Sequence, residues 1–164
     1  MRRFRVSLVA VMVAALAAAA VASAAPSKTP PKKVAFTAKY SGQVSIQGSG
    51  SAVAVSATGT GSATLIGAGK VTGSGTADST QQPCVPFGGT ASMTGAKGSI
   101  AFTVTAGANG CGDEGGHVFS ITGHATVTKA TGALAKAKGA LKFTGIYNRD
   151  DGTFSIKFTG TLTK

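Results

Sequence analysis

The sequence predicts an all-β protein, an antiparallel meander of eight to ten short strands closed into a small β-barrel, with no substantial helix beyond the N-terminal segment. Hydrophobic and polar residues alternate with a period of two along several stretches, which is typical of half-buried strands. Glycine is unusually common, with 24 residues, and clusters of Gly, Asn, Asp and Ser separate the alternating stretches. Short strands bounded by such turn residues indicate a sandwich or a barrel.

The alternation is clearest near the end of the chain. In residues 153–163, Phe, Ile and Leu fall on even-numbered positions, and Ser, Lys and Thr fall mostly on odd ones. Successive strand residues point to opposite faces, so one face of this strand is expected in the core. The same pattern recurs at 34–40, 44–46, 53–55, 100–104 and 119–121.

The last two strands are expected to form a hairpin around residues 148–152, whose Asn, Asp and Gly residues favour a tight turn. Apolar positions are odd-numbered in the first of these strands and even-numbered in the second. Both sets face inward only if odd residues pair with even ones, because a slip of one residue would expose a whole set. We therefore expect Phe143 to lie opposite Phe158 or a near neighbour, with Lys142 and Lys157 outside.

A β-solenoid is the alternative fold, and a short helical turn is a possible local exception to the strands. Glycine- and threonine-rich strands also occur in β-solenoids, which need a fixed repeat period. The dipeptide Thr-Gly occurs eight times at irregular intervals, so a closed sheet is favoured. Residues 133–140 contain helix-forming residues, but Gly132 and Gly139 bracket them closely and leave room for a single turn. Glycine within strands is typical of bulges and close backbone approach, which small barrels need at their corners.

Residues 1–24 are interpreted as a signal peptide. Three arginines precede an apolar run, Val6–Val21, that is short for a membrane span of ~20 residues. The next residues, Ala22-Ser23-Ala24, are small, as signal peptidase requires. A short membrane anchor is the alternative. Cleavage after Ala24 leaves no membrane span and implies a secreted protein, either extracellular or periplasmic.

Beyond the cleavage site, residues 25–33 form a linker rich in proline and lysine, and residues 34–164 form the expected barrel domain. Loss of three arginines lowers the net charge from the +11 of the whole chain to +8. Cys84 and Cys111 are the two cysteines, and in an exported protein they are expected to form a disulfide. The disulfide would close a loop of about 28 residues, which stabilises the fold by ~3.6 kcal/mol in the chain-entropy model. Free thiols and a metal-binding pair are the alternatives.

The segment from Thr131 to Gly139, Thr-Gly-Ala-Leu-Ala-Lys-Ala-Lys-Gly, resembles the Thr-Gly-x-Phe-x-x-Ala-x-Gly signature of the allene oxide cyclase and dirigent barrels. That family includes small exported bacterial members, and the resemblance covers roughly residues 88 to 164. Leu134 stands where an aromatic residue is common in the family, and Lys129-Ala130 replaces a Gly-Gly lead-in. The resemblance implies a barrel. It carries no catalytic residues to this chain, because the family's cyclase or coupling-site residues cannot be placed on it.

No residue is assigned a catalytic, cofactor-binding or metal-binding role. The most polar segment, residues 109–117, contains Asp113, Glu114 and His117. Their spacing does not fit a calcium loop, so a solvated loop pinned by the disulfide is the favoured interpretation. His117 and His124 are seven residues apart, which places them on opposite faces of one strand, and they are not expected to share a metal. The sequence has no nucleophile elbow, phosphate loop or dinucleotide fingerprint in its required context.

These observations favour a secreted, non-enzymatic module that binds a small apolar ligand in the barrel, because the inward positions are mostly Val, Ile, Phe, Ala and Gly. A cyclase- or dirigent-type enzyme that directs a substrate by shape is one alternative, which the resemblance allows. An envelope or adhesion protein is another, because a lysine-rich exterior weakly attracts anionic envelope polymers. Nucleic acid is not an expected partner, because single strands stack on aromatic residues interleaved with cations, and the chain has no Trp and two Tyr.

The mature N-terminus is expected to be Ala25, since Ala22-Ser23-Ala24 ends the apolar run with small residues. N-terminal sequencing or peptide mapping of the exported protein measures this directly. Exported protein that still begins at Met1 would contradict cleavage.

Overall fold

The computed structural model describes residues 30–164, so the signal peptide and most of the linker expected from the sequence lie outside the described residues. Nine strands and one short 3₁₀ turn form this part of the chain. They are β1 (Lys33–Gln47), β2 (Ala52–Ala63), β3 (Gly67–Asp78), β4 (Cys84–Gly95), β5 (Gly98–Val104), β6 (Asn109–Gly112), β7 (Val118–Ala130), η1 (Gly132–Leu134), β8 (Lys138–Asn148) and β9 (Thr153–Thr163).

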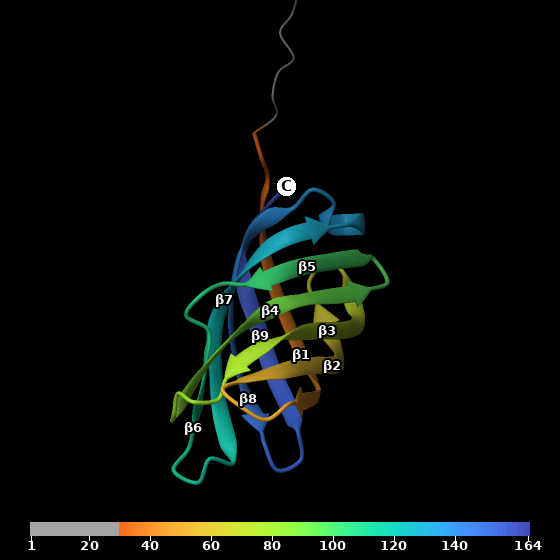
Figure 1. Cartoon of the computed structure of the whole chain (residues 1–164). Helices are drawn as coiled ribbons and strands as arrows, with labels where there is room; N and C mark the ends of the chain where they lie inside the picture. The colour runs from red at the N-terminus through yellow and green to blue at the C-terminus, as the bar shows by residue number, and fades with distance from the viewer. Residues whose placement is uncertain (1–29) are drawn as a thin grey trace, which may run out of the picture. The chain divides into compact units, whose positions relative to one another are not determined.

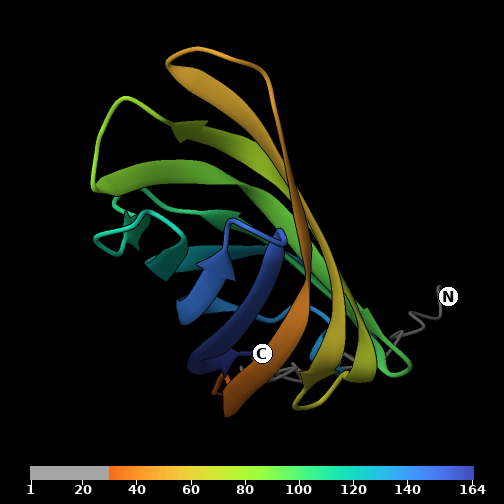
Figure 2. The ribbon, with the colours of Figure 1, turned by 90° about the horizontal axis from the view of Figure 1, so that it is seen from below.

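The strands form an antiparallel meander that closes on itself. Consecutive strands pair with each other except β5 and β6, which both pair with β4 and β7, and β1 pairs with β9 to complete the ring. Eight strands form the barrel and one extra strand adds to it. Figure 1 shows the barrel from the side, and Figure 2, turned by 90°, shows the strands curving around the interior. The predicted all-β meander closed into a barrel is confirmed.

The extra strand, β6, shares one barrel position with β5. Next to the β4–β5 turn, β5 lies between β4 and β7, and it ends at Val104. β6 continues the pairing with both neighbours. The sequence predicted a loop over residues 109–117. This prediction is wrong for residues 109–112, which form a strand. They satisfy backbone groups of β4 and β7 that the short β5 leaves unpaired, and the loop is confined to residues 113–117.

The predicted disulfide is confirmed. Cys84 of β4 lies directly opposite Cys111 of β6 in the strand register, and their sulfur atoms are bonded. The bond ties the short strand to the barrel wall, and it is consistent with an oxidising compartment. Within residues 30–164, no helix is long and apolar enough to span a bilayer.

The C-terminal hairpin has the predicted register. Phe143 of β8 lies opposite Phe158 of β9, and both side chains are buried, with 2% and 4% of their surface exposed. Lys142 and Lys157 are exposed on the outer face. Odd residues therefore pair with even ones, and both apolar sets lie inside the barrel.

The two ends of the barrel differ. The base is the end of the barrel where β1 begins and where β9 finishes. The mouth is the opposite end, where β3 and β8 finish. In Figure 1 the base is at the top, beside the C-terminus. The base is closed by η1, which places Leu134 among fully buried side chains. These are Ile66, Met93, Ile100, Leu134, Leu141 and Leu162. The segment that carries the family resemblance thus forms the plug of the base.

A glycine is required where this plug meets the wall. Gly132 has a φ of +59°, a left-handed conformation in which side chains other than glycine are strained. A Cβ on Gly132 would also collide with the carbonyl oxygen of Lys97. The plug can therefore approach the β4–β5 turn closely only because this position has no side chain.

Replacing Phe158 with Ala is expected to lower the free energy of unfolding by ~3–5 kcal/mol, because it removes a buried aromatic ring from the interior of the barrel. Replacing the adjacent Lys157 with Ala is expected to change it by less than about 0.5 kcal/mol, since this side chain is exposed. Urea unfolding of the two variants measures both values. Equal losses, or a larger loss for Lys157, would contradict the orientation of β9.

Candidate functional site

The mouth half of the barrel contains a cavity of about 440 Å³. It is lined by residues from every strand of the barrel wall, and it lies between the filled base and the mouth. Its apolar lining residues include Val44, Val53, Val55, Ala57, Val71, Ala91, Val104, Ile121 and Ile156, together with the aromatic residues described below. The volume falls in the range of roughly 300–1,000 Å³ that is typical of small-molecule sites.

One wall of the cavity is aromatic. Phe143 and Phe158 of the C-terminal hairpin lie with their ring centroids 5.6 Å apart, and Phe102 of β5 lies 5.2 Å from Phe158. Phe87 is 6.2 Å from Phe143. These separations and tilted planes are typical of favourable aromatic pairs. The rings of Phe102, Phe143 and Phe158 are buried in the barrel and line the open volume of the cavity.

Much of the wall formed by β3 and β4 carries only glycine and alanine at the cavity, namely Gly73, Gly75, Ala77, Gly89 and Ala91. Gly75 of β3 lies opposite Gly89 of β4, and both line the cavity. A Cβ on either glycine would collide with a carbonyl oxygen of the neighbouring strand. The tight coiling of these two strands therefore demands glycine, and the missing side chains leave the interior unfilled. The cavity is a direct consequence of this glycine wall facing the aromatic wall.

The cavity lining contains one charged side chain, Arg149, which follows β8 at the mouth. Its backbone N–H donates to the carbonyl oxygen of His117 at 2.8 Å, which fixes this position on the rim. Tyr147 also lines the cavity, and burial raises the pKa of its hydroxyl. Any ligand here would meet apolar surface at depth and a positive charge only at the opening.

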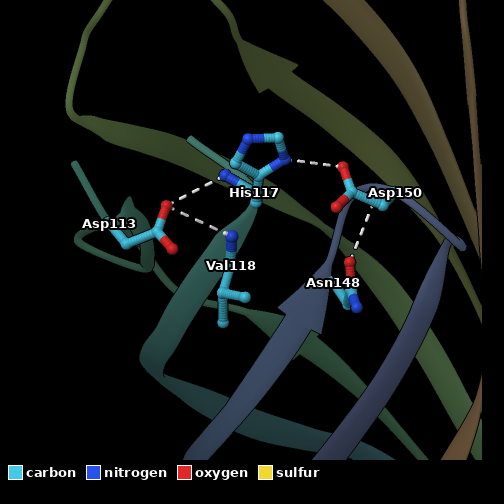
Figure 3. Close-up of polar contacts among 5 residues, drawn as sticks. All are labelled: Asp113, His117, Val118, Asn148 and Asp150. Carbon is cyan, nitrogen blue, oxygen red and sulfur yellow. Dashed lines mark hydrogen bonds and ion pairs between the residues drawn. The ribbon is translucent and has the colours of Figure 1, made fainter. Parts of the chain in front are cut away.

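A polar cluster lies on the rim beside Arg149 (Figure 3). The Nδ1 atom of His117 donates to a carboxylate oxygen of Asp150 at 2.8 Å. The Asp113 carboxylate accepts hydrogen bonds from the backbone N–H groups of His117 and Val118, at 2.9 and 3.3 Å. The β8–β9 turn is further held by the Asn148 side chain, which accepts from the N–H of Asp150 at 2.9 Å. The cluster links the loop before β7 to the last hairpin.

The electrostatics of this cluster are those of an exposed ion pair. The hydrogen bond to Asp150 and the charge of that carboxylate raise the pKa of His117 above its ordinary value. The backbone hydrogen bond from His117 lowers the pKa of Asp113. His117 and Asp150 are each more than half exposed, so solvent screens the pair and its contribution to stability is small. Its effect is to hold the loop before β7 against the β8–β9 turn.

The structure separates the polar residues that the sequence singled out. Asp113 and His117 join the rim cluster, whereas Glu114 makes no hydrogen bond or ion pair within residues 30–164. His124 lies on the outer face of β7, away from His117. In the same part of the chain, no group of three or more His, Cys, Asp or Glu side chains is placed to hold a metal ion.

Two residues of the site and the core were not singled out from the sequence. Arg149 was taken only as part of a turn, although it is the one arginine beyond residue 5, and that isolation was an available signal. Tyr40 of β1 is 2% exposed, and its hydroxyl is the one buried side-chain polar atom without a hydrogen-bond partner in residues 30–164. Burial raises its pKa. No sequence pattern distinguishes this tyrosine from an ordinary inward strand residue.

Comparisons with known proteins add no family to this description. No protein-family model matches the chain, and no curated protein matches it either.

Replacing Asp150 with Asn is expected to lower the pKa of His117, because the carboxylate that stabilises the charged imidazole is removed. An NMR titration of the wild-type protein and the variant measures the change. The raised folded-state pKa makes the pair stabilising below the unfolded value, and this contribution is lost as the pH rises through the folded value.

The same substitution therefore destabilises the protein more at about pH 5.5 than at about pH 8.5. Thermal unfolding at the two pH values measures this difference. An unchanged His117 titration, or a larger destabilisation at the higher pH, would contradict the contact.

Proposed function

We propose that the protein is exported and that it binds a small apolar ligand, without chemical turnover, in the cavity at the mouth of the barrel. The observation that carries the proposal is the cavity itself, an open volume of about 440 Å³ with an almost wholly apolar lining. A barrel whose purpose is purely structural gains stability by filling such a space, because lost packing contacts cost free energy. The sequence instead places glycine and alanine along one wall.

The chemistry of the lining favours binding over catalysis. The described residues that line the cavity include none of the five acidic residues and neither histidine. General acid–base catalysis uses such groups within reach of the reacting atoms. The rim cluster of His117, Asp150 and Asp113 is exposed and lies outside the cavity lining. A cyclase- or dirigent-type reaction remains a second hypothesis that rests on the family resemblance alone.

Export is proposed from the signal-like segment at residues 1–24, and the disulfide supports it, because disulfides persist in oxidising compartments. The proposed membership of the allene oxide cyclase and dirigent barrels rests on the Thr131–Gly139 segment. The barrel is compatible with that family without identifying it.

A bulky side chain in the cavity is expected to block ligand binding. Ala57 lines the cavity from β2, whereas Ala54 of the same strand is exposed on the outer face. We expect Ala57→Phe to weaken binding of the neutral apolar dye Nile red by at least about tenfold, a loss of ~1.4 kcal/mol. Ala54→Phe is the matched control and should leave the affinity unchanged. Fluorescence titration measures both.

Equal losses in the two variants, or no dye binding by folded wild-type protein, would contradict the proposed site. Native mass spectrometry of protein purified from its own host tests the proposal independently, because a retained ligand adds its mass to the intact protein. Reduction of that mass signal in Ala57→Phe would place the ligand in the cavity.

A further inference from the structure

Acidic side chains gather at one end of the barrel and a group of lysines gathers at the other, while the remaining five lysines of residues 30–164 lie along the strands and Arg149 lies at the mouth. All five acidic residues lie at the mouth: Asp78 ends β3, Asp113 and Glu114 lie in the loop between β6 and β7, and Asp150 and Asp151 lie in the β8–β9 turn. The base has the opposite charge. Six exposed lysines surround it, and we call them the lysine cap: Lys32, Lys33, Lys97, Lys136, Lys138 and Lys164.

Backbone contacts hold the lysine cap together. Lys32 and Lys164 exchange two backbone hydrogen bonds, at 2.8 and 3.0 Å. Lys33 and Lys138 both lie opposite Thr163, one on each side of β9, so they are about two strand spacings apart, roughly 10 Å. These four lysines come from the two ends of the described chain and from the start of β8, and the barrel closure brings them together.

The 3₁₀ turn joins the remaining lysines to this group. The carbonyl oxygen of Lys97 accepts a hydrogen bond from the N–H of Ala133 at 2.8 Å. The Lys164 ammonium group donates to the carbonyl oxygen of Ala133, also at 2.8 Å. Lys136 is separated from the turn only by Ala135. The lysine cap is therefore one contiguous surface built on the plug of the base.

The fold does not account for this concentration of positive charge. No lysine of residues 30–164 forms an ion pair with a carboxylate, and like charges held close together destabilise the folded state. Lys136 has a φ of +65°, a conformation that glycine adopts without strain and that lysine adopts at a cost. Both features disfavour stability, so they point to selection for an external partner.

We propose that the lysine cap binds a linear acidic polysaccharide, a hydrated polymer with regularly spaced anionic groups. Lysine ammonium groups are strongly hydrated point charges on flexible stems, which suits a polymer whose anionic groups are themselves solvated. Exposed hydroxyl groups also lie at the base. Those of Thr64 and Thr131 already bond to Thr37 and Ser99, whereas the exposed hydroxyl of Thr94 is available to a sugar hydroxyl.

The same surface is a poor match for a bilayer or for single-stranded nucleic acid. Interfacial membrane binding uses a buried apolar face, yet Leu65 is the one large exposed hydrophobic residue at the base within residues 30–164. Base stacking uses aromatic side chains, and the cap contains none. A polymer on the base would leave the acidic mouth, and with it the cavity, facing away from the polymer.

The test compares two triple variants that lose the same charge. The cap variant carries Lys97→Gln, Lys136→Gly and Lys138→Gln, and the side variant carries Lys39→Gln, Lys142→Gln and Lys157→Gln. The side lysines are exposed on the outer face of β1, β8 and β9. Fluorescence anisotropy with end-labelled polygalacturonate in about 50 mM NaCl measures the affinity.

We expect the cap variant to bind polygalacturonate at least about tenfold more weakly, with a shallower dependence of log K on log salt by about two. The side variant should lose less than about threefold. Equal losses would overturn the proposal, because the attraction would then follow net charge alone. Nile red fluorescence and urea unfolding verify that both variants are folded.

Two further measurements test the nature of the partner and the orientation of the bound protein. Vesicles with anionic phosphatidylglycerol and duplex DNA serve as competing polyanions. Tighter binding of either than of polygalacturonate, with the loss again confined to the cap variant, would overturn the polysaccharide as partner. Nile red affinity should be unchanged at saturating polygalacturonate, and its loss would overturn the proposed orientation. These outcomes are independent of the ligand proposed for the cavity, because dye binding is lost in Ala57→Phe and retained in the cap variant.

Discussion

The pairing of β1 with β9 is the contact on which the rest of the structure depends. It runs in continuous register from Lys33 opposite Thr163 to Gln43 opposite Thr153, and it joins the two ends of the described chain. Without it, β1 and β9 would be edge strands with unpaired backbone groups, which are prone to association. With it, the number of strands fixes the width of the barrel. The interior volume is then set, and the inward side chains decide how much of it is filled.

The inward side chains fill the interior unevenly, and the site follows from that difference. At the base, Leu134 on the plug packs among fully buried aliphatic residues. Toward the mouth, the large side chains come mainly from β7, β8 and β9, whereas much of the lining from β3 and β4 is glycine and alanine. Glycine at positions 75 and 89 is imposed by close backbone approach, so the empty wall is not free to be refilled without changing the coil of the strands. Stability at the base and openness at the mouth are therefore consequences of one barrel with two kinds of lining.

Much of the fold could be predicted from the sequence because its signal is local. A period of two identifies strands such as β9, and parity alone fixes the register that places Phe143 opposite Phe158. The strand β6 could not be predicted, because Asn109–Gly112 has no hydrophobic alternation and is held in place by its neighbours and the disulfide. The small inward residues indicated room for a ligand in the barrel, but the place of the cavity at the mouth could not be predicted. It depends on which inward residues face each other across the barrel, and sequence distance does not report that.

The placement of charged residues also could not be predicted from the sequence. Net charge could be counted from the sequence, but the assignment of each charge to an end needed the topology, because an antiparallel meander sends alternate turns to opposite ends. The turns with Asp113 and Asp150 reach the mouth, and those with Lys97 and Lys136 reach the base. A cavity that exchanges ligand with solvent needs an unobstructed opening. Placing an adhesive surface at the closed end satisfies that need, since attachment there leaves the opening free. The two proposed roles are thus compatible in one small barrel because its ends are chemically distinct.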